Sequence, residues 1–590
     1  MSLMSVLNVG SRALQTSQLG IDITGQNVAN ADVAGYSRKR INQTTLYAYD
    51  SAFGQMGLGA TVVNIERMRN TFLDTQIRKQ NSEVGYFAEV TSSFNRMEAI
   101  LVEPSDLGIM YYLDEFFSSW QNLANNPEDL SARTMVRTNA EVMIDNFRKA
   151  AIELANLRQQ KNDEIPMRIN RVNQLSYEIM NLNQEVAAVE LGNQNANDSR
   201  DRRDMLLKEL SMLIEINVIE NDLGQVTVTT AGSVLIAPSY MQSLEMTTNI
   251  REMPDGTILR DVGIRFSESK LNFMPTGGQL RGLIDSRDIY IPEYQKKLDD
   301  FAAAIVKTIN DAHLQGYNLQ GYSGFNFFDP NHTTAATMRL APAIISNVQN
   351  IAAATAHQSE IAGKNTIRVA GTIITPADPS DPASVDVVDP GYKFGDQPVQ
   401  LIRDPSNPVQ THARNIIADT VTVAVKTRNG VPLQPHERIV LVEGVDYRID
   451  YTFGTFQMLH DGYDGEEFDI DFQYFVGGFK GPGDNTNALL IAELRNSLTM
   501  TPDSIGNPTA TFAEYFSSVI GRLGLNTNQA QSNLQTRIFL AEQYEAQQDM
   551  IAGVSLDEEM ANLIRFQHTY TAAARLITTV DRMLETLLNM

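Results

Sequence analysis

The chain has 590 residues, of which 43% are hydrophobic and 20% charged, enough for about three to four domains of ~150 residues each. Its formal charge is −24, from 71 acidic and 47 basic residues. Binding to nucleic acid or to anionic lipid requires a basic surface, so we expect neither nucleic acid nor a membrane as a partner. The absence of cysteine excludes disulfides, thiolate metal sites and a cysteine nucleophile.

No targeting segment is visible in the sequence. Residues 1–20 lack the basic start and unbroken apolar run of a secretory signal. No stretch of ~18 apolar residues predicts a transmembrane helix. If the protein leaves the cell, we expect a route that does not use a cleaved signal.

Residues 3–28 carry a heptad pattern that predicts a helix with one apolar face. Leu7, Leu14, Ile21 and Val28 recur every seven residues, and the second seam is formed by Leu3, Gly10, Ser17 and Thr24. The 4-3 spacing places both sets on one face. Because large residues alternate with small ones, we expect a partner helix to approach closely over ~39 Å.

The end of the chain mirrors this pattern. Ser555 is a candidate N-cap, and Glu558 completes a capping box. Glu559 and Arg582 are predicted to lie off the apolar face. The apolar stripe that follows the cap consists of Leu556, Met560, Leu563, Phe566, Tyr570, Ala573, Ile577, Val580, Leu584 and Leu587. Each terminal segment alone could be an ordinary amphipathic core helix, but the two together favour a pair that contacts each other and neighbouring subunits.

The middle of the chain alternates between helical and β patterns. Residues 46–66 are Gly-rich and extended, with a short strand at 62–65, and residues 70–212 keep a 3–4 period typical of helices. Alternation predicts strands over 213–285, and helix returns over 290–315. Residues 365–478 read as a β-rich insertion, with loops crowding 376–408 and turns at Asn429-Gly430 and Asp461-Gly462. Helix resumes near Asn487.

The predicted fold class is mainly α with β insertions, in a discontinuous multi-domain chain. We expect the terminal helices to pair as a coiled coil, followed by a helical bundle and outer β-rich domains. The predicted domains are 1–45 with 545–590 (terminal helices), 46–212 with 286–320 and 484–544 (bundle), 213–285 (small β-rich segment) and 321–483 (inserted β-rich domain).

A search for catalytic and metal-binding patterns finds none, and we expect no enzyme activity and no cofactor. His313 lies in a predicted helix and is interpreted as a packing or surface residue. Residues 461–467 suggest a calcium loop but lack the ligand spacing of an EF-hand, so a solvated hairpin turn is favoured. Asp198, Asp201 and Asp204 stand beside arginines and are interpreted as exposed ion pairs on one helix.

Residues 27–38 and residues 556–570, near the two ends of the chain, resemble the signatures of flagellar rod, hook and hook-associated proteins. The first is the N-terminal signature, residues 27–38, with Asn27, Asn30, Gly35, Tyr36 and Arg38. Gly35 permits the bend after the helix. The second is the C-terminal signature, residues 556–570, with Leu556, Asp557, Glu558, Glu559, Asn562 and Phe566.

The resemblance extends in order along about 70% of the chain, and its Ser37-Arg38 variant is similar to the hook-associated members. Intermediate segments that resemble the family are 57–78, 116–133, 197–204, 277–283, 310–328 and 483–489. Residues 330–480 show no such likeness, so the sequence assigns this insertion no role.

The resemblance implies a structural subunit of the flagellum, at the junction of hook and filament. It implies an axial protein exported unfolded by the flagellar type III apparatus to an extracellular, or else periplasmic, flagellum. Implied partners are copies of the same chain in a ring, hook protein, hook-associated protein 3 and an export chaperone. The assembly interface would be formed by Leu3, Leu7, Leu14, Ile21, Val28, Met560, Leu563, Tyr570, Ile577, Val580 and Leu584. Alternatives are another axial protein (hook, distal rod or flagellin) or an exported adhesin or enzyme carried on the insertion.

Overall fold

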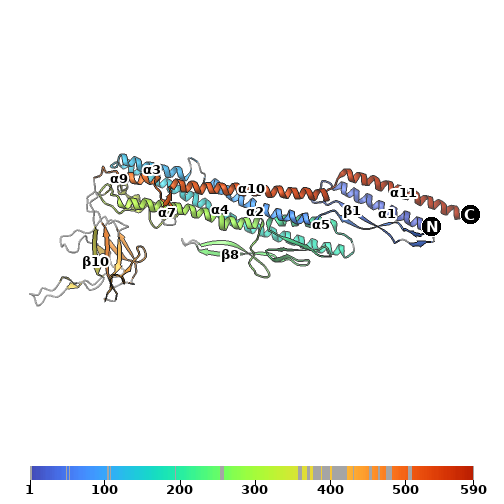
Figure 1. Ribbon diagram of the computed structural model, residues 1–590, viewed down its shortest axis with the longest axis horizontal. Coiled ribbons are helices and arrows are strands. Elements are labelled where there is room, and N and C mark those ends of the chain that lie inside the picture. The colour runs from blue at the N-terminus through green and yellow to red at the C-terminus, as the bar shows by residue number, and fades with distance from the viewer. Residues whose placement is uncertain are drawn as a thin grey trace, which may run out of the picture. The chain divides into compact units, whose positions relative to one another are not determined.

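The computed structural model confirms a mainly α fold with β insertions (Figure 1). It describes residues 3–47, 49–51, 54–101, 105, 108–192, 194–252, 258–355, 362–368, 373–375, 387–388, 399–400, 421–428, 431–450, 455–460, 462, 466–473, 481–502 and 508–588.

Eleven α-helices lie within these described residues. They are α1 (Leu3–Ala29), α2 (Thr71–Leu101), α3 (Ile109–Asn125), α4 (Leu130–Glu190), α5 (Asn197–Leu213), α6 (Gly278–Asp285), α7 (Ile291–Gln315), α8 (Pro342–Ser346), α9 (Thr486–Glu493), α10 (Phe512–Ala552) and α11 (Leu556–Leu588). A π-helical turn, η1 (Ser286–Tyr290), connects α6 to α7, and short 3₁₀ turns are η2 (Val348–Asn350) and η4 (Leu494–Asn496).

The strands form small antiparallel sheets. Those before the insertion are β1 (Lys39–Thr45), β2 (Tyr49–Ser51), β3 (Gly54–Met56), β4 (Ala60–Arg67), β5 (Asn217–Glu220), β6 (Val226–Thr230), β7 (Ser233–Ile236), β8 (Leu244–Glu252) and β9 (Ile258–Phe266). Later ones are β10 (Ala362–Arg368), β11 (Ile373–Thr375), β12 (Val387–Val388), β13 (Val399–Gln400), β14 (Thr422–Val425), β15 (Thr427–Arg428), β16 (Val431–Pro432), β17 (Ile439–Val440), β18 (Tyr447–Asp450), β19 (Thr455–Met458), β20 (Glu467–Gln473), β21 (Met500–Pro502) and β22 (Pro508–Ala510).

The chain divides into two compact units, each assembled from separate stretches of sequence. The first unit comprises residues 1–96, 156–292 and 524–590, and the second comprises 97–155 and 293–523. This division is coarser than the four predicted domains, whose limits stay a prediction.

In the first unit, α1 and α11 lie side by side, and both chain termini lie at the same end of this pair (Figure 1). The ribbon β1–β4 follows α1, with Ile41 opposite Ile65. A separate core forms where α4, α5 and α6 pack on the sheet β5-β6-β7 and the ribbon β8-β9, around residues such as Ile169, Leu210 and Phe266. The predicted strands of 213–285 are therefore present up to Phe266, and α6 follows.

The second unit has an aromatic core. Trp120, the only tryptophan of the chain, is fully buried against the rings of Phe116 and Phe327. His313 lies in the same core, so of the two interpretations left open, a packing or a surface residue, the structure supports packing. Large aromatic residues bury much apolar surface and interlock through edge-to-face contacts, which stabilises this core.

Hydrogen bonds hold together the two ends of the insertion. The backbone N–H of Thr355 donates to Oδ2 of Asp484 (2.7 Å), and those of Asn487 and Ala488 donate to the carbonyl of Ala353 (3.1 and 3.0 Å). The chain therefore leaves and returns at adjacent points. Several side chains between Phe327 and Ala354, among them Met338, Ile344 and Ile351, are buried in the helical part of the unit, in a segment that the sequence analysis grouped with the inserted domain.

The described part of the insertion forms two sheets, with strand orders β10-β20-β14-β17 and β13-β19-β18. Their shared core includes Val423, Tyr447, Phe456, Phe468 and Phe472. This confirms a β-rich insertion. The predicted loops over 376–408 lie largely outside the described residues. The turn at Asn429-Gly430 also lies outside them, as does most of 461–467, where a hairpin turn was favoured over a calcium loop.

Candidate functional site

The two terminal signatures meet at the buried side chain of Asn27. Its amide nitrogen donates to Glu559 Oε2 (3.0 Å) and to the Lys39 carbonyl (2.9 Å). Its oxygen accepts from the Tyr36 hydroxyl (2.8 Å) and the Lys39 N–H (3.0 Å). An asparagine amide offers two donors and two acceptor lone pairs, and all four are used. Asn27 therefore joins the end of α1, the turn that follows it, and α11.

Arg38 forms the second link between the signatures. Its Nε donates to Glu559 Oε1 (2.8 Å), its NH1 group donates to Glu558 Oε2 (2.7 Å), and its backbone N–H donates to the Ala552 carbonyl (2.7 Å). Glu559 is only 2% exposed. The prediction that Glu559 lies off the buried face is therefore wrong. Its polar partners belong to the N-terminal signature, and the spacing of apolar residues in α11 gives no sign of them.

A cluster of buried charges adjoins this contact. Asp201 accepts from the backbone N–H (3.0 Å) and the hydroxyl (2.7 Å) of Ser37. Arg67, at the end of β4, donates to Asp201 (2.9 Å) and to Asp204 (2.6 Å). Both aspartates are buried, so their interpretation as exposed ion pairs on one helix is wrong. The partner arginines come from another element, which local spacing could not reveal.

Two further cations complete the cluster. Arg69 pairs with Asp74 (2.9 Å) and lies 3.5 Å from Asp204, and Lys39 pairs with Asp198 (2.5 Å). The turn of the N-terminal signature and Lys39 after it therefore contact α5, whose aspartates were not predicted to belong to a site. The only sequence feature that pointed to these aspartates was the likeness of residues 197–204 to the family.

The pKa values of the cluster favour its charged state. Burial raises the pKa of Asp204, but the charges of Arg67, Arg69 and Arg203 outweigh burial and hold it below its ordinary value. For Tyr36, burial and then the charges of Asp198, Asp201 and Glu559 raise the pKa to about 12. Asp204 is therefore ionised and the Tyr36 phenol neutral at neutral pH, which suits a structural role for these two side chains.

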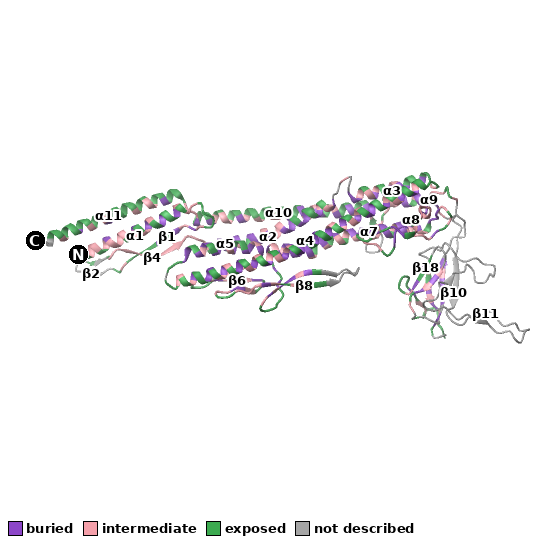
Figure 2. Ribbon diagram, turned by 180° about the vertical axis from the view of Figure 1, so that it is seen from behind, coloured by how far each residue is buried: buried purple, intermediate pink, exposed green. Residues whose placement is uncertain are grey.

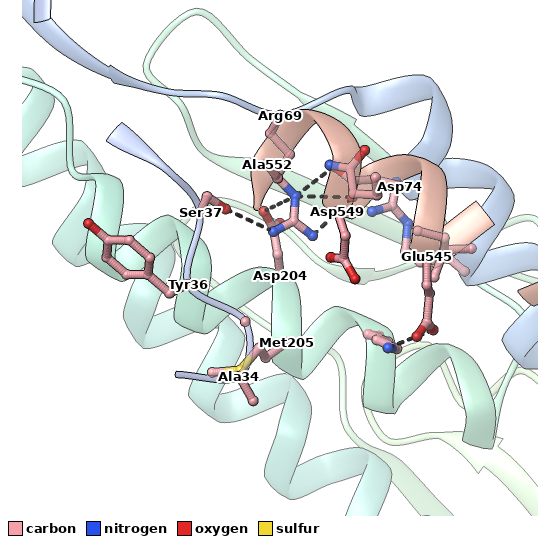
Figure 3. Close-up of a pocket in the computed structure, with 15 residues that line it drawn as sticks. Ala34, Tyr36, Ser37, Arg69, Asp74, Asp204, Met205, Glu545, Asp549 and Ala552 are labelled. Carbon is pink, nitrogen blue, oxygen red and sulfur yellow. Dashed lines mark hydrogen bonds and ion pairs between the residues drawn. The ribbon is translucent and has the colours of Figure 1, made fainter. Parts of the chain in front are cut away.

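A cleft of about 300 Å³ lies beside the cluster, lined by the signature turn, α2, α5 and the end of α10 (Figure 3). Gly35 adopts φ +81°, and an added Cβ would lie 2.2 Å from Met205 Sδ. Glycine alone accepts this backbone and this contact without strain, which confirms the bend predicted at Gly35. The salt bridge between Lys208 and Glu545 (2.6 Å) lies at the edge of the cleft.

Small residues of α1 form the seam against α11. A Cβ added to Gly10 would lie 3.0 Å from the Ile577 side chain, and one added to Gly20 would lie 2.7 Å from the ring of Phe566. Gly10, Ser17 and Thr24 are buried, whereas the large residues of the other seam are half-buried. The close approach expected from the alternation is present, and the small residues provide it.

The structure places the remaining signature and interface residues as follows. In the signatures, Asn30, Tyr36, Arg38, Asn562 and Phe566 are half-buried, and Gly35, Leu556, Asp557 and Glu558 are exposed. In the predicted interface, Val580 is buried, Leu7, Leu14, Ile21, Val28, Leu563, Ile577 and Leu584 are half-buried, and Met560 and Tyr570 are exposed. The side chain of Leu3 lies outside the described residues.

The described residues offer no metal centre. Among them, no three His, Asp or Glu side chains are grouped so that they could hold a metal ion. No helix in the same set combines the length and apolarity needed to cross a membrane.

Comparison with known families matches three parts of the chain. Residues 94–328 match the model described as the flagellar hook-associated protein FlgK helical domain. Residues 7–36 match a model of flagella basal body rod proteins, and residues 551–590 match the C-terminal model of flagellar basal body rod FlgEFG proteins. The two rod models cover only the regions of the terminal signatures.

Full-length relatives carry the same description. The chain is 26% identical over 624 residues to flagellar hook-associated protein 1 of Bacillus subtilis (strain 168), covering 99% of this chain and 97% of the relative. It is 25% identical over 601 residues to the protein of the same name from Salmonella typhimurium, covering 99% of each. The solved flagellar hook junction protein FlgK from Burkholderia pseudomallei is 17% identical, with a TM-score of 0.53 over 82% of this chain and 100% of that one, which shows a shared fold.

Proposed function

The chain belongs to the family of flagellar hook-associated protein 1, and from this membership we propose that it is a structural subunit that joins the flagellar hook to the filament and allows the filament to assemble. The observation that carries the proposal is the contact between the two signatures through Asn27, Arg38 and Glu559. These contacts join the two terminal helices, and the bonds of Ser37 and Lys39 attach the turn between them to α5.

The arrangement of matches distinguishes this function from the other axial roles. Rod-type models match the two ends alone, whereas the helical-domain model of the hook-associated protein matches the intervening bundle. A hook, distal rod or flagellin identity would leave that bundle unexplained. No described cluster of polar side chains in the insertion favours an adhesin or an enzyme.

The flagellar family places the chain among components that assemble with one another in the bacterial flagellum. We propose more specifically that copies form a ring between hook protein and hook-associated protein 3, after type III export to an extracellular flagellum with the help of a chaperone. The exposed apolar residues of α11, among them Met560 and Tyr570, support burial of this helix in an assembly.

Deletion of the gene tests the junction function directly. We expect cells with complete hooks, no attached filaments and flagellin released to the medium. Complementation with the full chain should restore filaments, and normal filaments in the deletion strain would remove the proposal.

We further propose that the insertion is dispensable for the junction, because its two ends lie side by side at Thr355 and Asp484. The variant replaces residues 356–480 with a short Gly-Ser linker and keeps the buried residues up to Ala354. We expect filament attachment to survive, as measured by counting attached filaments. An exported, folded variant that loses its filaments would show that the insertion carries contacts.

A further inference from the structure

The segment that leads into the insertion, residues 351–355, is fastened by buried polar side chains, and we call it the root segment. His313 of α7 accepts a hydrogen bond from the Ala352 N–H (2.9 Å), and Asn487 of α9 donates to the Ala352 carbonyl (2.8 Å). Both side chains are no more than 2% exposed. Figure 2 shows buried residues along α3, α7, α8 and α9 in this part of the second unit. The root segment is therefore held by side chains that water does not reach.

His313 can hold the root segment only as a neutral ring. Its Nδ1 lies 2.6 Å from the Phe325 carbonyl oxygen, which can only accept a hydrogen bond. The Ala352 N–H can only donate, so Nδ1 carries the single ring proton and Nε2 is the acceptor. A proton on Nε2 would place two donors against each other and would remove the acceptor of the Ala352 N–H.

Arg133 of α4 places a cation beside this histidine. Its guanidinium donates to the carbonyls of Ile351 and Pro127 and forms no ion pair with a carboxylate of the described residues. Burial lowers the pKa of Arg133 to about 10. The charge of Arg133 also disfavours protonation of His313. A positive charge on the imidazole would therefore be buried, unpaired and repelled.

The other elements around the ring add no compensating charge from the described residues. Trp120 of α3 and Phe327 contact the imidazole edge to face. The carboxylate nearest to the root segment in its bonding, Asp484, accepts from the Thr355 N–H (2.7 Å) and does not shift the pKa of His313. Protonation of the ring therefore finds no stabilising partner in the closed root.

We propose that His313 is an acid-sensitive fastening: protonation of its ring releases Ala352 and opens the root segment, whereas α3 stays folded. The opening extends to the start of α9, because the Asn487 N–H donates to the adjacent Ala353 carbonyl (3.1 Å). In acid the insertion is then attached to the helical part of the unit by fewer hydrogen bonds. This device does not depend on the proposed junction function.

The size of the effect follows from two protonation equilibria. Burial, with a smaller effect of Arg133, lowers the pKa of His313 to about 4 in the closed root. In the open root the ring has its ordinary pKa of about 6.5. The open root therefore binds more protons below pH 6.5, and acid favours it. The ratio of open to closed root segment should rise about twentyfold between pH 7 and pH 5.

Amide exchange of the full chain at pH 7 and pH 5 tests the proposal, with rates corrected for the intrinsic pH dependence of exchange. We expect the opening of residues 351–355 to increase about twentyfold at pH 5, while the amides of α3 exchange more slowly at both pH values. An unchanged opening ratio, or a root segment that exchanges only together with α3, would overturn the proposal.

His313→Gln separates titration from packing, because glutamine keeps an amide acceptor and binds no proton in this pH range. We expect its root segment to open equally at pH 7 and pH 5, and a rise that persists in this variant would overturn the proposal. His332→Gln is the matched control. His332 is half-buried in the same unit and pairs with Asp329 (3.1 Å), so its replacement should leave the acid response intact.

A nuclear magnetic resonance titration of the imidazole nitrogens in the unsubstituted chain provides a readout that needs no folded variant. We expect His313 to remain the neutral Nδ1–H tautomer in the closed root down to pH 5. Uptake of a proton near pH 6.5, with residues 351–355 still protected from exchange, would contradict the proposal.

Discussion

The terminal pair α1/α11 and the core of the second unit are stabilised in different ways. The core buries whole aromatic side chains, including Phe116, Trp120 and Phe327. The terminal pair buries chiefly small or polar groups, such as Ser17, Asn27 and Ala573. Buried apolar area is the main source of stability, so we expect the second unit to be stable by itself and the terminal pair to be marginal.

This difference indicates that the aromatic core provides stability, whereas the terminal pair provides specificity of helix pairing. A seam of small residues brings two helices close but buries little apolar surface, whereas the hydrogen bonds of Asn27 and Glu559 select one register. Such a pair opens at low cost and gains stability when other copies cover it. We therefore predict weak amide-exchange protection for residues 10–28 in the purified monomer, and strong protection there would contradict this view.

The largest expected effect is in the aromatic core. Phe327→Ala should lower the free energy of unfolding of the second unit by about 3–5 kcal/mol, because it leaves a cavity among fully buried rings. Trp120 is the only tryptophan, so its fluorescence reports this unit alone. Phe539→Ala, at an exposed position, is the matched control and should leave the transition in place.

Glu559→Ala should act on the terminal pair alone. It removes the carboxylate that accepts from the buried Asn27 amide and from Arg38, and Arg38 keeps only Glu558. The unsatisfied Asn27 donor should cost about 1–3 kcal/mol within the pair. We expect faster amide exchange in α1 and α11 with an unchanged Trp120 transition. A shift of that transition would show that the two regions are more tightly coupled than we propose.

The pH dependence should also separate the regions. Burial, with a smaller effect of Arg133, lowers the pKa of His313 to about 4, against an ordinary value of about 6.5. Its Nδ1–H donates to the Phe325 carbonyl and its Nε2 accepts from the Ala352 N–H, so the folded state holds the neutral ring. The unfolded state then binds more protons between pH 4 and 6.5, and stability falls as pH decreases through this range.

We expect a loss of about 2 kcal/mol from the second unit between pH 7 and pH 5 from this group, followed by Trp120 fluorescence. The variant His313→Asn should lose that slope. The pKa of Asp204 is lowered instead, so its contribution is complete above about pH 4 and is lost only below it. The contacts of Asp204 with Arg67 and Arg69 should therefore persist at pH 5.

The smallest expected effects concern the outside of the terminal pair. Arg582 is exposed and pairs with no described carboxylate. Arg582→Ala should therefore change the free energy of unfolding by at most about 1 kcal/mol and leave motility near that of the wild type. Leu563 and Ile577 are half-buried, and Ile577 lies on the seam against Gly10. Both belong to the terminal pair, so Leu563→Asp and Ile577→Asp should still spare the Trp120 transition of the second unit. In a ring they introduce an unpaired charge into every contact, and we expect exported protein that does not retain filaments.

Periodicity predicted the helices because both terminal segments and α4 repeat apolar residues at helical spacing. It could not reveal that Glu559 lies inside, since the partners of this residue are 532 and 521 residues away in sequence. The same limit applies to Asp201, whose partner Arg67 comes from β4.

The bond between Asn27 and Glu559 also dictates an order of events in time. The two residues are separated by almost the whole chain. A polypeptide delivered from its N-terminal end, by synthesis or through a narrow channel, therefore cannot form this hydrogen bond until the start of α11 has emerged. The aromatic core needs only residues up to Leu523 and can form first. The terminal pair is therefore the last element to form, and each copy remains open at its ends until it is complete.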